Sequence, residues 1–172
     1  MVQLKIKNKW ISLGGSSYVT DMDDNEIYKV KGKVFTFTNK KYFYDKDGKL
    51  LFIIRNKFWR LFTRRAFVLD PDGNVVCRVS KKYLSIRSKF MIDQYKDQIL
   101  IDGNVFDYNY NITENGKDIG HISRKISLRD SFVLTIEDES KAAFYCALVI
   151  AIDCILDRRN AQHSSSNSNN WD

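Results

Sequence analysis

The feature that most limits the fold is an apolar segment near the C-terminus, KAAFYCALVIAIDCILDRR at residues 141–159. Acidic residues precede it at 137–139 and Arg158 and Arg159 follow it, which is the order that complements a helix dipole. We therefore predict one helix over residues 140–158, about 27 Å long, with Ser140 as a candidate N-cap. Every residue from 142 to 156 is apolar except Asp153, so this helix has no polar face.

Such a helix either anchors the chain in a membrane or lies inside a protein core. A membrane span needs about 20 predominantly apolar residues, and the uninterrupted run here is 11 residues, 142–152. Asp153 near the centre of a span would cost about 2.5–3.5 kcal/mol. We favour the core and do not expect an integral membrane protein, with an anchor flanked by Arg158 and Arg159 as the alternative. Asp153 is then a structural buried acid that needs hydrogen-bond donors or a basic partner.

Composition indicates a single domain in a reducing compartment. The chain has 172 residues, within the range of one domain, and a net charge of +7 that favours an anionic partner. Its three cysteines include no closely spaced pair, which is typical of reduced and buried thiols. The N-terminus, MVQLKIKNKW, has no apolar signal region. We expect a cytoplasmic protein, with peripheral membrane association as an extension of that location.

Before residue 140 the dominant period is two, which is typical of strands. In VFDYNYNI, residues 105–112, aromatic and aliphatic side chains alternate with Asp and Asn, and KLLFIIR (49–55) and FVLTI (132–136) are denser apolar runs. Hairpin dipeptides recur at Asp47-Gly48, Asp72-Gly73, Asp102-Gly103 and Asn115-Gly116. Two segments, YFYDKDGKLLFIIR and AFVLDPDGNVVCRV, share an Asp-x-Asp-Gly turn between strands, and YVTDMDDNEIYKV repeats it without the glycine.

These signals predict a mainly β meander of about a dozen short strands followed by one helix. A sheet of this size closes into a barrel or splits into a sandwich, and neither the period nor the turns decide between the two. The domain is expected to cover residues 1–159. The polar stretch NAQHSSSNSNNWD, within residues 160–172, is expected to be a disordered tail.

The combination of this meander and FYCALVIAIDCIL resembles the LURP-one-related family, over roughly residues 5–158. That family belongs to the tubby-like C-terminal superfamily, whose fold phospholipid scramblases share. The best match is in the helix, where residues 148–155 resemble the family pattern of aliphatic-Val-Ala-aliphatic-Asp-x-Ile, with Ile150 as an additional aliphatic residue. The resemblance implies a closed antiparallel barrel around a central hydrophobic C-terminal helix. It also implies a soluble protein and binding of phosphoinositide or membrane surfaces, without assigning binding residues.

No constellation for catalysis or for a metal is recognised, so we expect no enzyme activity, no catalytic residue, no cofactor and no metal. His121 is interpreted as a strand residue, and zinc-ligand spacing is absent. LGGSSY, residues 13–18, lacks the lysine and helix of a phosphate loop. DMDDNE, residues 21–26, lacks the distal glutamate of a calcium loop and is interpreted as a hairpin turn.

Two segments mix cations with aromatic residues, RNKFWRLFTRRAF (55–67) and RVSKKYLSIRSKF (78–90). Cations beside aromatics suit an anionic membrane surface or a membrane-proximal partner, and the same mixture suits single-stranded nucleic acid. A nucleic-acid-binding or regulatory protein is therefore the second-ranked interpretation. The plainer interpretation is that the aromatics fill the barrel and the cations coat it. The candidate lipid- or anion-binding residues are Arg60, Arg64, Arg65, Lys81, Lys82 and Arg87. The sequence does not predict whether they share one face, or the oligomeric state.

Overall fold

Twelve strands and one long helix make up the computed structural model, which describes residues 1–7, 16–32, 40–56, 65–82, 88–104, 109–124 and 131–166. The strands are β1 Val2–Lys7, β2 Ser16–Thr20, β3 Glu26–Gly32, β4 Lys41–Asp45, β5 Leu50–Asn56, β6 Arg65–Leu69, β7 Val75–Lys82, β8 Ser88–Asp93, β9 Ile99–Asn104, β10 Asn109–Glu114, β11 Lys117–Arg124 and β12 Ser131–Ile136. A 3₁₀ turn, η1 Glu139–Lys141, then leads into the helix, α1 Ala142–Ser166.

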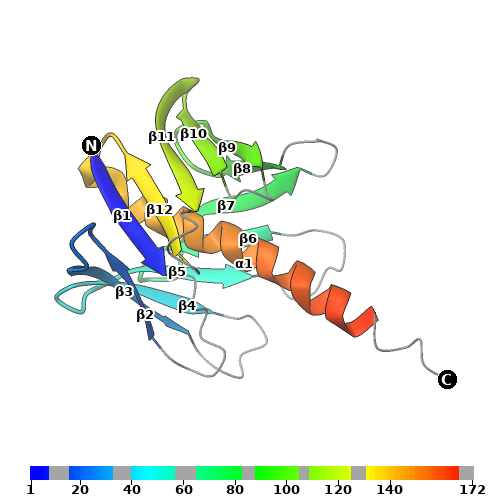
Figure 1. Ribbon diagram of the computed structural model, residues 1–172, viewed down its shortest axis with the longest axis horizontal. Coiled ribbons are helices and arrows are strands. Elements are labelled where there is room, and N and C mark those ends of the chain that lie inside the picture. The colour runs from blue at the N-terminus through cyan, green and yellow to red at the C-terminus, as the bar shows by residue number, and fades with distance from the viewer. Residues whose placement is uncertain are drawn as a thin grey trace.

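The strands form a closed antiparallel barrel, which confirms the fold expected from the resemblance and excludes the sandwich. Each strand pairs with its neighbours in sequence, and β1 closes the ring by pairing with β12 from Val2↔Ile136 to Lys7↔Ser131. Figure 1 shows α1 passing between the strands and emerging on the side where the C-terminus lies. The barrel is therefore an up-and-down meander threaded by its own last element.

The recurring Asp-rich turns share one hydrogen-bond pattern. In each, the first aspartate carboxylate accepts the backbone N–H four residues later, at 2.8–2.9 Å; these aspartates are Asp21, Asp45 and Asp70. Gly48 and Gly73 take positive φ angles of 82° and 93° at the fourth position. Asp24 occupies the equivalent position in the first turn with φ 68°. The Asp21 turn thus keeps the same conformation although it has no glycine, because Asp tolerates the left-handed region better than most residues.

One predicted hairpin turn is wrong: Asp102-Gly103 lies inside β9 and not between strands. Gly103 pairs with Tyr110 of β10 and with Ser88 of β8. A Cβ atom at this position would lie 2.0 Å from the backbone oxygen of Asn109. The glycine is there because the backbone of the neighbouring strand approaches too closely for a side chain.

The helix begins and ends away from the predicted residues. Asp138, and not Ser140, is the cap: its Oδ1 accepts the backbone N–H of Ser140 at 2.9 Å, and η1 precedes α1. The helix extends to Ser166, past the predicted end at residue 158, since no Gly or Pro interrupts its backbone ladder. The last part of the predicted tail, residues 167–172, lies outside the described residues.

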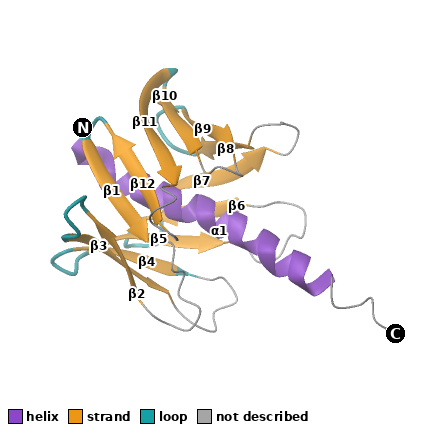
Figure 2. Cartoon of the chain, viewed as in Figure 1, coloured by secondary structure: helices purple, strands orange, loops and turns teal. Residues whose placement is uncertain are grey.

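The core is the contact between α1 and the inside of the barrel. All side chains of residues 144–156 are buried, and the helix packs mainly against β5, β6 and β7. The largest of the fully buried side chains come from both partners: Tyr145, Leu148 and Ile150 on α1, and Ile6, Phe43, Ile54, Phe90, Ile101, Ile112, Ile122, Leu134 and Ile136 on the wall. Figure 2 shows the helix surrounded by strands along its first half.

Within the described ranges, no helix is long and apolar enough to cross a membrane. The apolar segment at residues 141–159 forms the core helix because the side chains of residues 144–156 are buried against the barrel wall.

Replacing Ala147 with arginine tests the enclosure of α1. Ala147 is 0% exposed, so an arginine there would be an unpaired buried charge in a space that fits one methyl group. We expect the Ala147→Arg protein not to fold, as measured by circular dichroism and size-exclusion chromatography. Met91→Arg is the matched control, because Met91 is 40% exposed on β8 and should tolerate the change. A folded, monodisperse Ala147→Arg protein would contradict the central helix.

Candidate functional site

The strand ends form two rims, one at each end of the barrel. Because successive strands run in opposite directions, β1, β3, β5, β7, β9 and β11 all end where their successors begin. The register confirms this for the pairs Gly32↔Lys41, Asn56↔Ala66, Lys82↔Lys89, Asn104↔Asn109 and Lys7↔Ser131. Nine cations occupy the last two described positions of strands at this end: Lys7, Lys31, Lys41, Arg55, Arg65, Lys81, Lys82, Lys89 and Arg124. We call this ring the basic rim.

At the basic rim, the last two positions of the described strands contain no acidic residue. The opposite end carries the turns that join even-numbered strands to the next, together with η1. Its described acids are Asp21, Asp23, Asp24, Glu26, Asp45, Asp47, Asp70, Asp72, Asp93, Asp97, Glu114, Asp118, Glu137, Asp138 and Glu139. Only five lysines accompany these acids in the described turns and strand ends: Lys46, Lys49, Lys96, Lys117 and Lys141. We call this end the acidic rim.

Three of the six predicted binding residues lie at the ends of the neighbouring strands β6 and β7 at the basic rim. Arg65 begins β6 opposite Ser80 of β7, and Lys81 and Lys82 end β7 opposite Phe90 and Lys89 of β8. Arg65 and Lys82 are exposed. Lys81 is 9% exposed, and its ammonium group lies 5.8 Å from the centre of the Phe90 ring, so it is a packed side chain of the wall.

The other three predicted residues, Arg60, Arg64 and Arg87, lie outside the described residues. Their flanking strands, β5 with β6 and β7 with β8, are joined at the basic rim. Convergence of the three side chains stays a prediction.

The six candidate binding residues included neither Arg55, which begins the first cation-rich segment, nor Lys31 on β3. Lys31 is exposed at the end of β3 with its ammonium 5.2 Å from the Tyr44 ring, and the Arg55 guanidinium lies 5.7 Å from the Phe67 ring. The sequence signal that could have identified these cations is the alternation of successive turns between the two ends of the barrel. In a meander, every second connection lies at the same end, so the charges flanking alternate connections add up at one rim.

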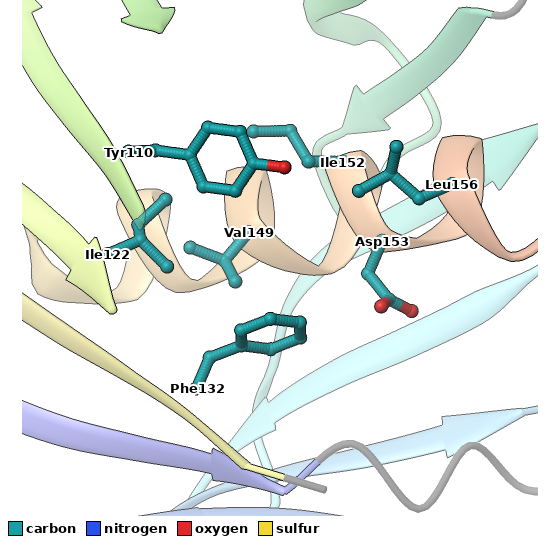
Figure 3. A pocket seen from close by; sticks show the side chains of 7 residues that line it. All are labelled: Tyr110, Ile122, Phe132, Val149, Ile152, Asp153 and Leu156. Atoms are coloured by element: carbon teal, nitrogen blue, oxygen red, sulfur yellow. The ribbon is translucent and has the colours of Figure 1, made fainter. Parts of the chain in front are cut away.

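Asp153 lies on α1 and is 3% exposed. Figure 3 shows it beside Leu156 on the helix, with Tyr110 and Phe132 contributed by the barrel wall. The cavity between them measures about 10 Å³, barely the space of one water molecule. This space is too small for an organic ligand. The identity of the partner of Asp153 stays a prediction.

The DMDDNE segment is a hairpin turn, as interpreted from the sequence. The Asp21 carboxylate accepts the backbone N–H groups of Asp23 and Asn25 and the side-chain amide of Asn25. The Asn25 hydrogen bond lowers the pKa of Asp21. His121 lies exposed in β11, also as interpreted.

The thiols are buried and therefore weak nucleophiles. Cys77 and Cys146 are 0% exposed and Cys154 is 5% exposed. Burial raises the pKa of Cys77 to about 12, and burial also raises the pKa of Cys146.

These features define a class of protein: a closed antiparallel β-barrel whose core is its own C-terminal helix. The chain belongs to the LURP-one-related family, whose model matches residues 2–153. It is similar to the uncharacterized protein YxjI of Bacillus subtilis, at 29% identity over 157 residues that cover 91% of this chain and 94% of the relative. The X-ray structure of an Arabidopsis thaliana protein shares the fold, with a TM-score of 0.61 and 20% identity, over 92% of this chain and 91% of that one.

The burial of the three cysteines predicts their reactivity. With a pKa of about 12, Cys77 would be ionised to only about one part in 10⁴ at pH 8. We expect a thiol reagent such as Ellman's reagent to leave the native protein unmodified and to modify all three cysteines after denaturation, as counted by absorbance. Stoichiometric modification of the native protein within minutes would contradict the packed core.

Proposed function

We propose that this chain is a non-enzymatic binding module that docks its basic rim on an anionic phospholipid surface. The observation that supports this most is the ring of nine cations without an intervening acid at the described strand ends of that rim. Each cation held near an anionic bilayer contributes about 1 kcal/mol, so a ring of this size is sufficient for peripheral attachment even when some members stay solvated.

The shape of the ring favours a membrane over a nucleic acid. The cations come from strands all around the barrel and surround the end from which α1 emerges. A flat surface can contact many members of such a ring at once, whereas a linear polyanion would contact only those along one line. The acidic rim would at the same time be repelled, so the charge separation orients the protein with α1 pointing its C-terminal end at the surface.

Aromatic side chains support the same proposal. The Lys31 ammonium group lies over the Tyr44 ring, and the Arg55 guanidinium group lies over the Phe67 ring. These contacts hold the cationic heads near the wall, which reduces the conformational entropy lost on docking. The localisation that follows is peripheral, on the membrane face that exposes anionic lipid.

Vesicle co-sedimentation tests the proposal. We expect binding to vesicles of phosphatidylcholine with phosphatidylserine and negligible binding to phosphatidylcholine alone. The double variant Arg65→Gln/Lys82→Gln removes two exposed cations of the basic rim, so its partition coefficient should fall about 30-fold, equivalent to about 2 kcal/mol. Salt should weaken binding of both proteins because the contacts are exposed.

The matched control is Lys46→Gln/Lys49→Gln, which removes the same charge from two exposed residues of the acidic rim. Its partition coefficient should stay within about twofold of wild type if the rim, and not net charge, carries binding. Equal loss in the two double variants would contradict the basic rim as the docking face. Negligible binding to both vesicle types, together with a salt-dependent shift of single-stranded RNA or DNA, would overturn the proposal and favour nucleic-acid binding.

A further inference from the structure

The outer face of the barrel carries cations and aromatic rings along β2 to β6 (Figure 1). The side chains of these strands that point into the barrel are buried: Val19, Val30, Phe43, Ile54 and Ala66. Because side chains alternate along a strand, the residues next to them point outwards. We call this outward surface the outer wall, and its members are Tyr18, Lys29, Lys31, Tyr42, Tyr44, Ile53, Arg55 and Phe67.

The outer wall is positively charged. In the described positions of β2 to β7 the only acids are Glu26 and Asp45, and both lie at the acidic rim. The opposite side of the barrel is different, because Asp102 and Asp118 point outwards from β9 and β11, where the Asn111 amide donates to Asp118 at 2.6 Å. Positive charge is therefore concentrated on one side of the barrel, which favours a polyanion as the ligand of that side.

Strand pairing places the rings and the cations of the outer wall next to one another. Lys29 of β3 pairs with Tyr18 of β2 on one side and with Tyr44 of β4 on the other. The Lys29 ammonium lies 5.2 Å from the centre of the Tyr18 ring. Farther round the barrel, Arg55 of β5 pairs with Phe67 of β6. Since adjacent strands are about 5 Å apart and alternate residues about 7 Å apart, rings and cations alternate at these spacings.

The rings of the outer wall are the observation that points to a ligand. Tyr18, Tyr44 and Phe67 are only half-buried, and none of them belongs to the hydrophobic core between the barrel and α1. Large rings gathered on an outer surface mark an interaction site more often than a requirement of the fold. We call these three residues the wall rings, and the cations that lie over them, Lys29, Lys31 and Arg55, the wall cations.

The ligand that suits this surface combines planar rings with negative charges along a flexible chain. Bases stack on aromatic side chains, and phosphates contact lysine and arginine. An acidic peptide fits less well, because the closed barrel has no unpaired strand edge with which a peptide backbone could pair. A bilayer also fits less well, since the outside of a barrel is convex and would contact a flat surface only along a narrow stripe.

We propose that the outer wall binds single-stranded nucleic acid. The bases stack on the wall rings, and the phosphates contact the wall cations. Arg78 of the next strand takes no part, because its guanidinium group is paired with Asp93 at 3.1 Å. Recognition depends on stacking and charge, so RNA and DNA bind with little sequence preference.

Fluorescence anisotropy with a labelled oligouridylate of about 12 nucleotides tests this proposal. Tyr18→Thr/Tyr44→Thr removes two wall rings and keeps residues suited to strands, so the affinity should fall about 30-fold. Lys29→Gln should reduce the slope of log affinity against log salt by about 0.7, the value for one phosphate contact of a single strand. None of these three residues is a member of the basic rim, so both variants should keep vesicle binding.

Met91→Thr and Lys96→Gln are the matched controls, since both residues are exposed and lie outside the outer wall, on β8 and at the acidic rim. Each should change oligouridylate binding by less than about twofold. Polyphosphate and polyglutamate of the same charge should bind more weakly than oligouridylate, because neither has rings that can stack.

Equal binding of polyphosphate would reveal attraction by charge alone and overturn the proposal, as would undetectable oligouridylate binding or an unchanged affinity in Tyr18→Thr/Tyr44→Thr. Tighter binding of polyglutamate would overturn it in favour of an acidic protein partner. If the double variant proves unfolded by circular dichroism, the salt slope of Lys29→Gln decides. Vesicle binding and oligouridylate binding are measured separately, so failure of the membrane proposal leaves this one intact.

Discussion

Enclosure of α1 is the constraint on which the rest of the structure depends. A helix that is apolar on every side has to be covered on every side, and one sheet face could cover only half of it. A barrel of twelve strands has the converse problem, because its interior is wider than wall side chains alone can fill. Tyr145, Leu148 and Ile150 meet the wall residues in that space. Neither partner is stable without the other, so the barrel closes around the last element of the chain.

The even number of strands determines the direction of the helix. β12 ends at the acidic rim, so η1 turns the chain back there and α1 runs from the acidic rim to the basic rim. At the far end, the side-chain amide of Asn56 donates to the Cys154 carbonyl at 3.3 Å and ties the helix to β5. The positive end of the helix dipole thus lies among the acids of the acidic rim, which it favours.

Much of this architecture follows from local sequence signals, because strands, tight turns and a polar-free helix each have their own pattern. Closure of the barrel did not follow from those patterns, and the resemblance carried by residues 148–155 supplied it. Asp102-Gly103 has the residue types of a turn, but Gly103 is required because the backbone of the neighbouring strand approaches it closely. The local sequence pattern does not distinguish a turn glycine from a glycine of this kind. The partial convergence of Arg65, Lys81 and Lys82 depends on which rim each connection occupies.

Most of the outer wall was inaccessible to sequence reasoning for a different reason. Tyr18 and Tyr44 are 26 positions apart in the chain, and each alone has an ordinary explanation as an aromatic residue of a strand. Only the pairing of β2 and β4 with β3 places them on either side of Lys29. Long-range proximity of this kind leaves no periodic trace.

The helix α1 runs between the two rims, and its packing determines whether binding at one rim changes the structure at the other. Coupling between sites requires an element with two arrangements that each ligand favours differently. From residue 144 to residue 156 the side chains of α1 are buried in the barrel, and tightly packed interiors do not deform gradually. Asn56 at one end and the Lys141–Glu114 ion pair at the other also hold the helix in register. A ligand at the basic rim is therefore expected to leave the structure of the acidic rim unchanged.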